Sequence, residues 1–367
     1  MANKKYLSVT TTLFFFLIAL NIFSRSMFNI GSWFSYVNIL LTLVMFIFSF
    51  FEFTFTKKDI IWLISGICIA TFTYSLSCVL TILIMFSLRK INLKRSIKVI
   101  IFTIIISLLI IYFSSKLGII SNISFYRINN LRSSFGMQFP LVFSAYVFYL
   151  CVYLTIAYKK KNPIKVTIIL LITFFLLSQV VDARNDEYCI ALLILSIWFN
   201  KLKWSVKSKK TFINTVTVLV LVLIIFSIFI SQIIPYSSNI FTDLNNLFSG
   251  RLNLQYKLFQ NYRPHLTGQY IFQMGYGGQL LNVINYFYID NSFVRFLFMD
   301  GILFFIFILW TFLRQIFVLI NTSQYVYVLI LLIILINGIS SDTLSQLTQS
   351  IIILPLFYVS QSIFAEI

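Results

Sequence analysis

Arginine, asparagine and aspartate residues gather in the segment 248–301 of a chain that is otherwise strongly apolar. The segment opens with "FSGR", which ends at Arg251, and closes with "DNSFVRFLFMDG", which contains Asp290, Asn291 and Arg295. A guanidinium group presents a planar fork of donors that matches phosphate, whereas a carboxylate accepts a proton or a hydroxyl donor. Together these residue types indicate a site that binds an anion and accepts a proton.

The end of this segment leaves two roles open for Asp290. It directly precedes an apolar run, so it is either a base toward a hydroxyl group or the cap of a helix. Asn291 and Arg295 are i,i+4 neighbours, and we expect both side chains to point into one cavity mouth. His265 is the alternative base, although no metal-ligating partner lies near it. Asp300 is either a costly acid inside the membrane or an ordinary residue at its boundary.

Three upstream arginines are further candidates for binding the anion. Arg127 and Arg132 precede "SSFGMQFP", residues 133–140, and lie either at the rim of a pocket or against lipid headgroups. Arg184 belongs to "DARNDEYC", a short link, where it faces the same ligand or pairs with Glu187 at i,i+3. "GYGG", which includes Tyr276, permits a sharp turn but lacks the lysine and hydroxyl of a nucleotide-binding loop.

The composition places these residues in a membrane protein. Hydrophobic residues make up 60% of the 367-residue chain and charged residues 10%, with a mean hydropathy of +0.95. Soluble domains are about 25% charged, and a helix needs about 20 apolar residues to cross a bilayer. We therefore expect an all-α integral membrane protein formed by one domain over residues 1–367. The expected spans are 7–23, 33–55, 60–88, 97–113, 138–157, 164–181, 188–200, 212–233, 292–313, 325–340 and 350–364.

The run 60–88 is too long for one span and has basic residues at both ends, so we expect two short helices that form a hairpin. The total is then about 12 transmembrane helices. One large extracytoplasmic loop, 234–290, lies between two of them and is too rich in Tyr, Phe and Leu to be disordered. Within it, the i,i+4 spacing of Leu254, Leu258 and Tyr262 predicts a short helix that Ser249 or Gly250 caps and that Pro264 ends.

The distribution of the 28 Lys and Arg residues fixes the expected orientation. With both termini in the cytoplasm, most of them fall on the cytoplasmic side, as the positive-inside rule requires. Those on the opposite side are mainly arginine rather than lysine, which favours an anionic ligand there, with headgroup contacts or local ion pairs as the alternative. The candidate arginines Arg127, Arg132, Arg184, Arg251 and Arg295 all belong to that opposite side.

Metal and disulfide chemistry receive no support from the sequence. The four cysteines, Cys68, Cys78, Cys151 and Cys189, fall in apolar runs without a CxxC pattern, so we expect small buried side chains. The outward-facing acids form no DxD pattern or other ligand cluster. We predict no metal, no cofactor and no nucleic-acid partner.

The order of these motifs resembles that of the Wzy-type polysaccharide polymerases, which act on O-antigen, capsule or exopolysaccharide chains and belong to the superfamily of the O-antigen ligases. The matching order is "RSSFGMQFP", "DARND", "SGR", "GYG" and "DNSFVRFLFMDG", within a similar hydropathy layout. Ligase relatives typically have His-Asn where this chain has Asp290-Asn291, which favours the polymerase.

The resemblance implies a fold, a location and a reaction. We expect a GT-C-like architecture in the bacterial cytoplasmic (inner) membrane, and a metal-independent glycosyltransferase. The enzyme would transfer a growing glycan from its polyprenyl pyrophosphate lipid to a hydroxyl of another lipid-linked unit. Its partners would be that lipid-linked oligosaccharide, membrane lipid and a chain-length regulator.

The resemblance also distributes the roles among the residues. Asp290, Arg251 and Arg184 are then the catalytic candidates, and Arg132, Asn291, Arg295, Arg127 and Tyr276 the substrate-binding candidates. The rival functions are a flippase for the same lipid-linked sugar, which should show internal pseudosymmetry, a ligase-type glycan transferase, and an assembly scaffold without enzymatic activity.

Overall fold

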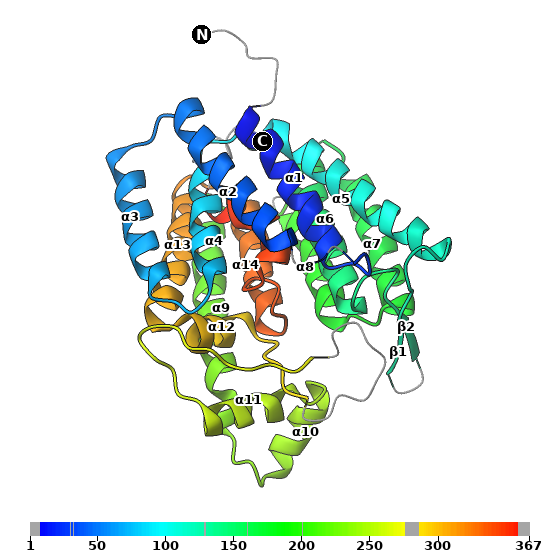
Figure 1. Ribbon diagram of the computed structural model, residues 1–367. Helices are drawn as coiled ribbons and strands as arrows, with labels where there is room; N and C mark the ends of the chain where they lie inside the picture. The colour runs from blue at the N-terminus through cyan, green and yellow to red at the C-terminus, as the bar shows by residue number, and fades with distance from the viewer. Residues whose placement is uncertain are drawn as a thin grey trace.

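The computed structural model is a bundle of helices that run mostly up and down past one another (Figure 1). The structure describes residues 8–29, 31, 33–127, 130–159, 161–199, 201–275 and 286–358. The bundle has two distinct ends. At the upper end in Figure 1 lies the start of α1, and at the lower end the short helices α10 and α11 project beyond the bundle. We call the lower end the α11 end.

The helices of the bundle follow one another with short links. In chain order they are α1 (Val9–Ser24), α2 (Trp33–Glu52), α3 (Lys57–Thr71), α4 (Leu76–Ser87), α5 (Leu93–Lys116), α6 (Pro140–Tyr158), α7 (Pro163–Val180), α8 (Arg184–Phe199), α9 (Val206–Ile233), α12 (Ser292–Arg295), α13 (Ile302–Asn321), α14 (Tyr325–Ile339) and α15 (Leu347–Ser350). A π-helical turn, η1 (Phe296–Asp300), joins α12 to α13, and a 3₁₀ turn, η2 (Leu354–Phe357), follows α15.

Six helices in the described part of the chain are long and apolar enough to cross a membrane, namely α2, α5, α6, α7, α9 and α13. Three shorter ones, α1, α4 and α14, are also apolar. Large apolar side chains on α2, α7 and α9 are exposed, and the buried ones form one continuous core. An apolar interior with an apolar exterior is the arrangement that lipid permits. The molecule is therefore a mostly helical, membrane-embedded protein.

The apolar run 60–88 forms two helices, as predicted. α3 ends at Thr71 and α4 begins at Leu76, and the two helices pack against each other. A capping box starts α3: the Thr56 side chain accepts from the Asp59 amide, and Asp59 accepts from the Thr56 amide. Asp59 also forms an ion pair with Arg89, which follows α4 and so ties the two ends of the hairpin together.

The prediction of an all-α chain missed one small sheet. β1 (Ser124–Arg127) and β2 (Asn130–Ser133) form an antiparallel hairpin before α6, with Phe125 opposite Arg132. Gly136, at φ +83°, then turns the chain, and a Cβ there would lie 2.9 Å from Ile120 and Ser115 side-chain atoms. The hairpin contacts the end of α7 at the α11 end of the bundle.

The long loop contains the predicted short helix. α10 (Asn239–Leu247) comes first, and α11 (Arg251–Asn261) packs against both α10 and α9. Leu252 and Leu258 bury the inner face of α11. Because α11 lies on the lower part of α9, its first residue is held beside the core of the bundle instead of in open solvent.

The return of the loop to the bundle depends on two glycines. Gly301 has φ +92°, and a Cβ on it would lie 2.5 Å from the Thr267 carbonyl carbon. A Cβ on Gly268 would lie 2.5 Å from the Met299 carbonyl oxygen. At this close approach the Gln269 amide donates to the Met299 carbonyl, and the Ile302 amide donates to the His265 carbonyl. Segment 265–270 is thereby fastened across the start of α13.

Candidate functional site

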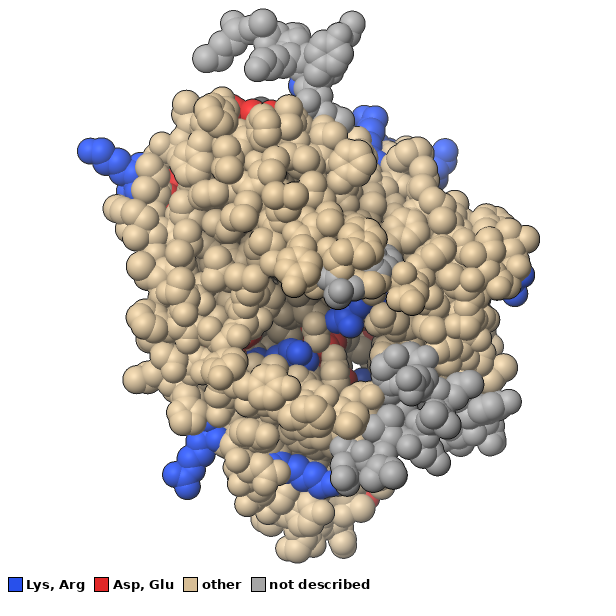
Figure 2. Space-filling view, in the orientation of Figure 1, with Lys and Arg blue, Asp and Glu red and all other residues tan. Residues whose placement is uncertain are grey.

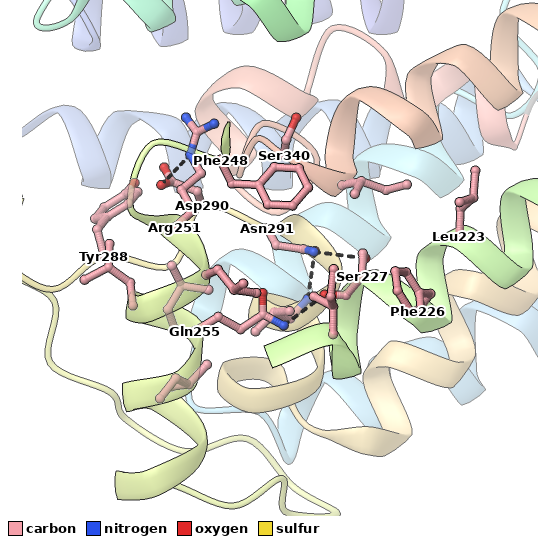
Figure 3. Close-up of a pocket in the computed structure, with 17 residues that line it drawn as sticks. Leu223, Phe226, Ser227, Phe248, Arg251, Gln255, Tyr288, Asp290, Asn291 and Ser340 are labelled. Atoms are coloured by element: carbon pink, nitrogen blue, oxygen red, sulfur yellow. Dashed lines mark hydrogen bonds and ion pairs between the residues drawn. The ribbon is translucent and has the colours of Figure 1, made fainter. Parts of the chain in front are cut away.

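The central feature of the α11 end is an ion pair between Arg251 and Asp290. Nε of Arg251 donates to Oδ2 of Asp290 over 2.9 Å. The two side chains are 32% and 20% exposed, so each is shielded from water but accessible on one side. In Figure 3 the terminal nitrogens of the guanidinium point away from the carboxylate. The ion pair thus holds the guanidinium in one orientation and leaves its two terminal nitrogens directed away from Asp290.

Arg251 owes its place to the start of α11. Gly250 is the N-cap residue, with φ +85° and no side-chain cap, so the prediction that Ser249 or Gly250 caps this helix is confirmed for Gly250. The first amides of a helix attract anions, and an arginine at the first position adds a full positive charge to them. The two features together favour an anionic ligand.

Of the two roles that the sequence left open for Asp290, the helix cap is not observed, because Asn291 takes that position. Asn291 Oδ1 accepts from the amides of Phe293 and Val294, and its Nδ2 donates to Ser227 Oγ on α9. Asn291 is only 9% exposed. Its side chain therefore locks the chain between α9 and α12, and Asp290 keeps its carboxylate for Arg251.

An apolar cavity of about 260 Å³ begins at this ion pair. It lies between α9, α11 and the segment 288–294, and Figure 3 shows Arg251 and Asp290 at one end of it. Its other walls are mainly apolar side chains, among them Leu223, Phe226, Leu252 and Leu258. Leu223 and Phe226 are 42% and 45% exposed on the outer face of α9, so the apolar wall continues onto the lipid-facing surface. We call this space the α9–α11 cavity.

A second polar cluster lies close to the ion pair and centres on Asp342, which precedes α15. Its carboxylate accepts from the Tyr288 hydroxyl over 2.5 Å and from Gln346 Nε2 over 3.1 Å. Arg295 Nη1 lies 3.7 Å from the same oxygen and donates to Gln273 Oε1 over 3.1 Å. This Asp342 cluster connects the long loop, α12 and the α14–α15 link.

Arg25 extends the Asp342 cluster from the first helix of the chain. Its Nε donates to Thr348 Oγ1 and its Nη2 to Gln346 Oε1, each over 2.9 Å. The sequence analysis did not select Arg25 as a site residue, and it did not select Asp342, Tyr288 or Gln346. The feature that could have identified Arg25 is that an arginine, not a lysine, stands at the end of an apolar run.

The other predicted site residues lie elsewhere. Arg184 is half exposed and pairs with Asp182 over 3.5 Å. It therefore forms a local ion pair, one of the two alternatives that the sequence left open, but with Asp182 instead of Glu187. Arg132 Nε donates to the Val181 carbonyl and joins β2 to the end of α7. Arg127 ends β1, and Tyr276 lies outside the described residues.

The prediction that Asn291 and Arg295 point into one cavity is also wrong. Asn291 lines the α9–α11 cavity, whereas Arg295 lines a larger one of about 490 Å³ on the other side of the Asp342 cluster. Asp300, which is only 7% exposed, lies in the wall of this larger cavity at the end of η1. Asn291 is the N-cap of α12, and its side chain turns back onto the amides of Phe293 and Val294, so it does not follow the direction of Arg295. His265 is exposed, and its carbonyl accepts from Ile302.

Charges at the site act on one another. Burial raises the pKa of Asp290 above its ordinary value; Arg251 opposes this effect, and Asp342 reinforces it. Burial alone would lower the pKa of the Arg251 guanidinium, but the Asp290 carboxylate outweighs it and raises that pKa. Arg251 therefore stays charged, and Asp290 takes up a proton more readily than an exposed aspartate.

Metal ligands do not gather in the described part of the chain, where no group of three or more His, Cys, Asp and Glu side chains comes together. Arg251, Arg295 and Arg25 supply positive charge here.

No protein-family model matches the chain, and comparisons with curated proteins and with solved structures gave no match either.

Proposed function

We propose that the protein is a membrane glycosyltransferase that polymerises lipid-linked oligosaccharides. In this proposal about twelve helical passes cross the bacterial cytoplasmic membrane, both termini lie in the cytoplasm, and the α11 end faces outward. The donor is a glycan on polyprenyl pyrophosphate, and the acceptor is a hydroxyl group of another lipid-linked unit. The motif order that resembles Wzy-type polymerases supports the same reaction.

One observation carries the proposal, namely the Arg251–Asp290 pair at the polar end of the α9–α11 cavity. A polyprenyl pyrophosphate has an apolar chain joined to a compact dianionic or trianionic group. The apolar walls on α9 and α11 suit the chain, and the outward fork of the guanidinium suits the pyrophosphate. Because these walls continue onto the exposed face of α9, a chain longer than the cavity can extend into lipid.

The proposed reaction needs one bond to form and one to break. The acceptor hydroxyl oxygen attacks the anomeric carbon of the donor sugar, and the bond from that carbon to the pyrophosphate oxygen breaks. Arg251 stabilises the negative charge that develops on the departing pyrophosphate, which leaves on its polyprenyl chain. The hydroxyl proton passes to the Asp290 carboxylate and then to water.

Purified protein, reconstituted with lipid-linked repeat units from the native membrane, tests this function. A polymerase yields lipid-linked glycans in a ladder of sizes and releases one polyprenyl pyrophosphate for each bond formed. A flippase would move the lipid without either product, and a ligase would place glycan on a different acceptor. Absence of both ladders and released polyprenyl pyrophosphate would contradict the proposal.

A further inference from the structure

The larger cavity next to the Asp342 cluster has a different chemical character from the α9–α11 cavity. Its volume of about 490 Å³ falls in the range of small-molecule sites, about 300–1,000 Å³. Polar side chains reach it from several parts of the chain: Ser75 and Ser77 near the start of α4, Gln269 in the long loop, Arg295 and Asp300 around η1, and Gln346. We call it the α2–α4 cavity, after two of the helices that enclose it.

Two tyrosines stand at the α2–α4 cavity on neighbouring segments. Tyr74 lies between α3 and α4, Tyr270 lies in the long loop, and their ring centroids are 6.3 Å apart. They are 71% and 65% exposed, although the close approach of Gly268 to Met299 holds the adjoining backbone rigidly. Exposed tyrosines on a fixed backbone offer apolar ring faces and a hydroxyl at low entropic cost.

The polar groups in the cavity complement neutral hydroxyl groups better than a phosphate. Asp300 accepts hydrogen bonds, Gln269 and Gln346 both donate and accept, and Ser75 and Ser77 do the same. Arg295 brings a cation, but Asp342 and Gln273 already engage it. Figure 2 shows a hollow, on the face that displays α1, α2 and α4, with both basic and acidic side chains inside. Mixed donors and acceptors beside aromatic rings are what a saccharide requires.

From this arrangement we propose that the α2–α4 cavity is a saccharide-binding site that takes the sugar end of the acceptor. The inference rests on the proposed function, because it assigns the pyrophosphate lipid to the α9–α11 cavity. The Asp342 cluster then stands between the two substrates: Tyr288 lines the α9–α11 cavity, Arg295 and Gln346 line the α2–α4 cavity, and Asp342 joins them. An acceptor sugar held by Gln346 and Arg295 would present its hydroxyl toward the donor.

Cysteine protection separates the two assignments in full-length protein in detergent. Ser75→Cys reports on the α2–α4 cavity and Phe248→Cys on the α9–α11 cavity. Both are made in a Cys68→Ser background because the prediction of a buried side chain is wrong for Cys68, which is exposed. Ser345→Cys, at another residue that lines the α2–α4 cavity, is a second reporter if Ser75→Cys does not fold. The rate of alkylation by a polar maleimide is measured for each variant.

Two probes are compared: the oligosaccharides released by mild acid from the carrier lipids of the native membrane, and polyprenyl pyrophosphate without sugar. The oligosaccharides should slow alkylation of Ser75→Cys and Ser345→Cys about tenfold at roughly ten times the dissociation constant, because only the free fraction reacts. They should leave Phe248→Cys unchanged, whereas polyprenyl pyrophosphate should protect only Phe248→Cys.

The outcomes distinguish the two ideas. If oligosaccharides protect neither α2–α4 reporter while polyprenyl pyrophosphate protects Phe248→Cys, the saccharide site is wrong and the lipid site stands. If oligosaccharides protect the α2–α4 reporters but polyprenyl pyrophosphate protects none, the saccharide site stands and the proposed lipid site fails. Protection of Ser75→Cys by polyprenyl pyrophosphate alone would overturn the assignment of the α2–α4 cavity to sugar.

Discussion

Nε of Arg251, in the first turn of α11, lies 2.9 Å from Oδ2 of Asp290, which comes from the far end of the same long loop. The two residues are 39 positions apart in the sequence, so their contact closes the loop on itself. The ion pair sets the direction of the guanidinium and also brings a carboxylate next to it. In the proposed reaction these are the two groups needed where the glycosyl bond to pyrophosphate breaks.

Asp290 is expected to act both as a base and as a partner of Arg251. Asp290→Asn keeps a carbonyl oxygen that accepts from Arg251 Nε but removes the proton acceptor. We therefore predict a fall in polymerisation rate of about 10²–10⁴-fold, the usual contribution of general base catalysis. Ladder formation from lipid-linked repeat units measures the rate, and Asp243→Asn on α10 is the control. A near-normal rate in Asp290→Asn would leave Asp290 with a positioning role only.

The raised pKa of Asp290 predicts the pH dependence of activity. Activity requires the carboxylate, so the acid limb should have its midpoint above about 3.9, the ordinary aspartate value. Arg295 lowers the pKa of Asp290, so Arg295→Gln should move the limb to higher pH. Rates relative to each variant's own maximum measure the shift. An unmoved or lowered limb in Arg295→Gln would contradict the electrostatic account.

The same group affects stability with a definite sign. Because the folded chain binds the Asp290 proton more tightly than the unfolded chain, its stabilising contribution is fully present below the ordinary pKa. It is lost as pH rises through the raised pKa of the folded state. Asp290→Asn should therefore weaken the pH dependence of thermal unfolding across this window, as followed in detergent. An unchanged pH dependence would show that Asp290 titrates alike in both states.

The Asp342 cluster should contribute measurably to stability. Tyr288→Phe removes the donor that lies 2.5 Å from Asp342, and a hydrogen bond to a charged group contributes about 1.5–3 kcal/mol. The apparent melting temperature in detergent should fall. Tyr236→Phe is the matched control, because Tyr236 is exposed and stacks on Tyr256. Equal melting temperatures for Tyr288→Phe and wild type would show that the hydrogen bond contributes little.

The close approach at Gly268 should be intolerant of a side chain. A Cβ there would meet the Met299 carbonyl oxygen at 2.5 Å and the Tyr74 amide at 2.7 Å. Gly268→Ala should therefore displace the backbone that carries Tyr270 and destabilise the protein by about 1–3 kcal/mol. Gly118→Ala is a demanding control: its φ is +73°, but open space surrounds it. Thermal unfolding compares the two, and a larger loss in Gly118→Ala would contradict the packing argument.

The sequence predicts the long helices because lipid imposes length and composition on each span, but up to residue 358 the predicted span 350–364 contains only the end of α15 and the turn η2. The division of 60–88 into α3 and α4 and the position of α11 both followed from such local patterns. The β1–β2 hairpin did not, because its residues lack a clear alternation and the contact of Arg132 with Val181 is made across the chain. Long-range contacts of this kind leave no local pattern.

Of the candidate site, the sequence predicted the Arg251–Asp290 pair but not the Asp342 cluster. Arg251 and Asp290 differ from their apolar surroundings, and residue type alone marks them. Arg25 lies near the start of the chain and Asp342 near its end. They belong to one cluster because Gln346 accepts from Arg25 and donates to Asp342. The i,i+4 argument for Asn291 and Arg295 failed because it assumed that both residues lie within a helix, whereas Asn291 is the N-cap of α12 and has an extended backbone.

Substitution of Arg251 by lysine tests the central claim most directly. Lysine keeps the positive charge but loses the fork of donors and the contact from Nε to Asp290. Arg263→Lys, at an exposed arginine of the same loop, is the matched control. We predict that ladder formation from lipid-linked repeat units falls by at least about tenfold in Arg251→Lys, and that Arg263→Lys behaves as wild type. Unchanged ladders in Arg251→Lys, with normal protein levels, would contradict the role of this guanidinium in holding the departing pyrophosphate.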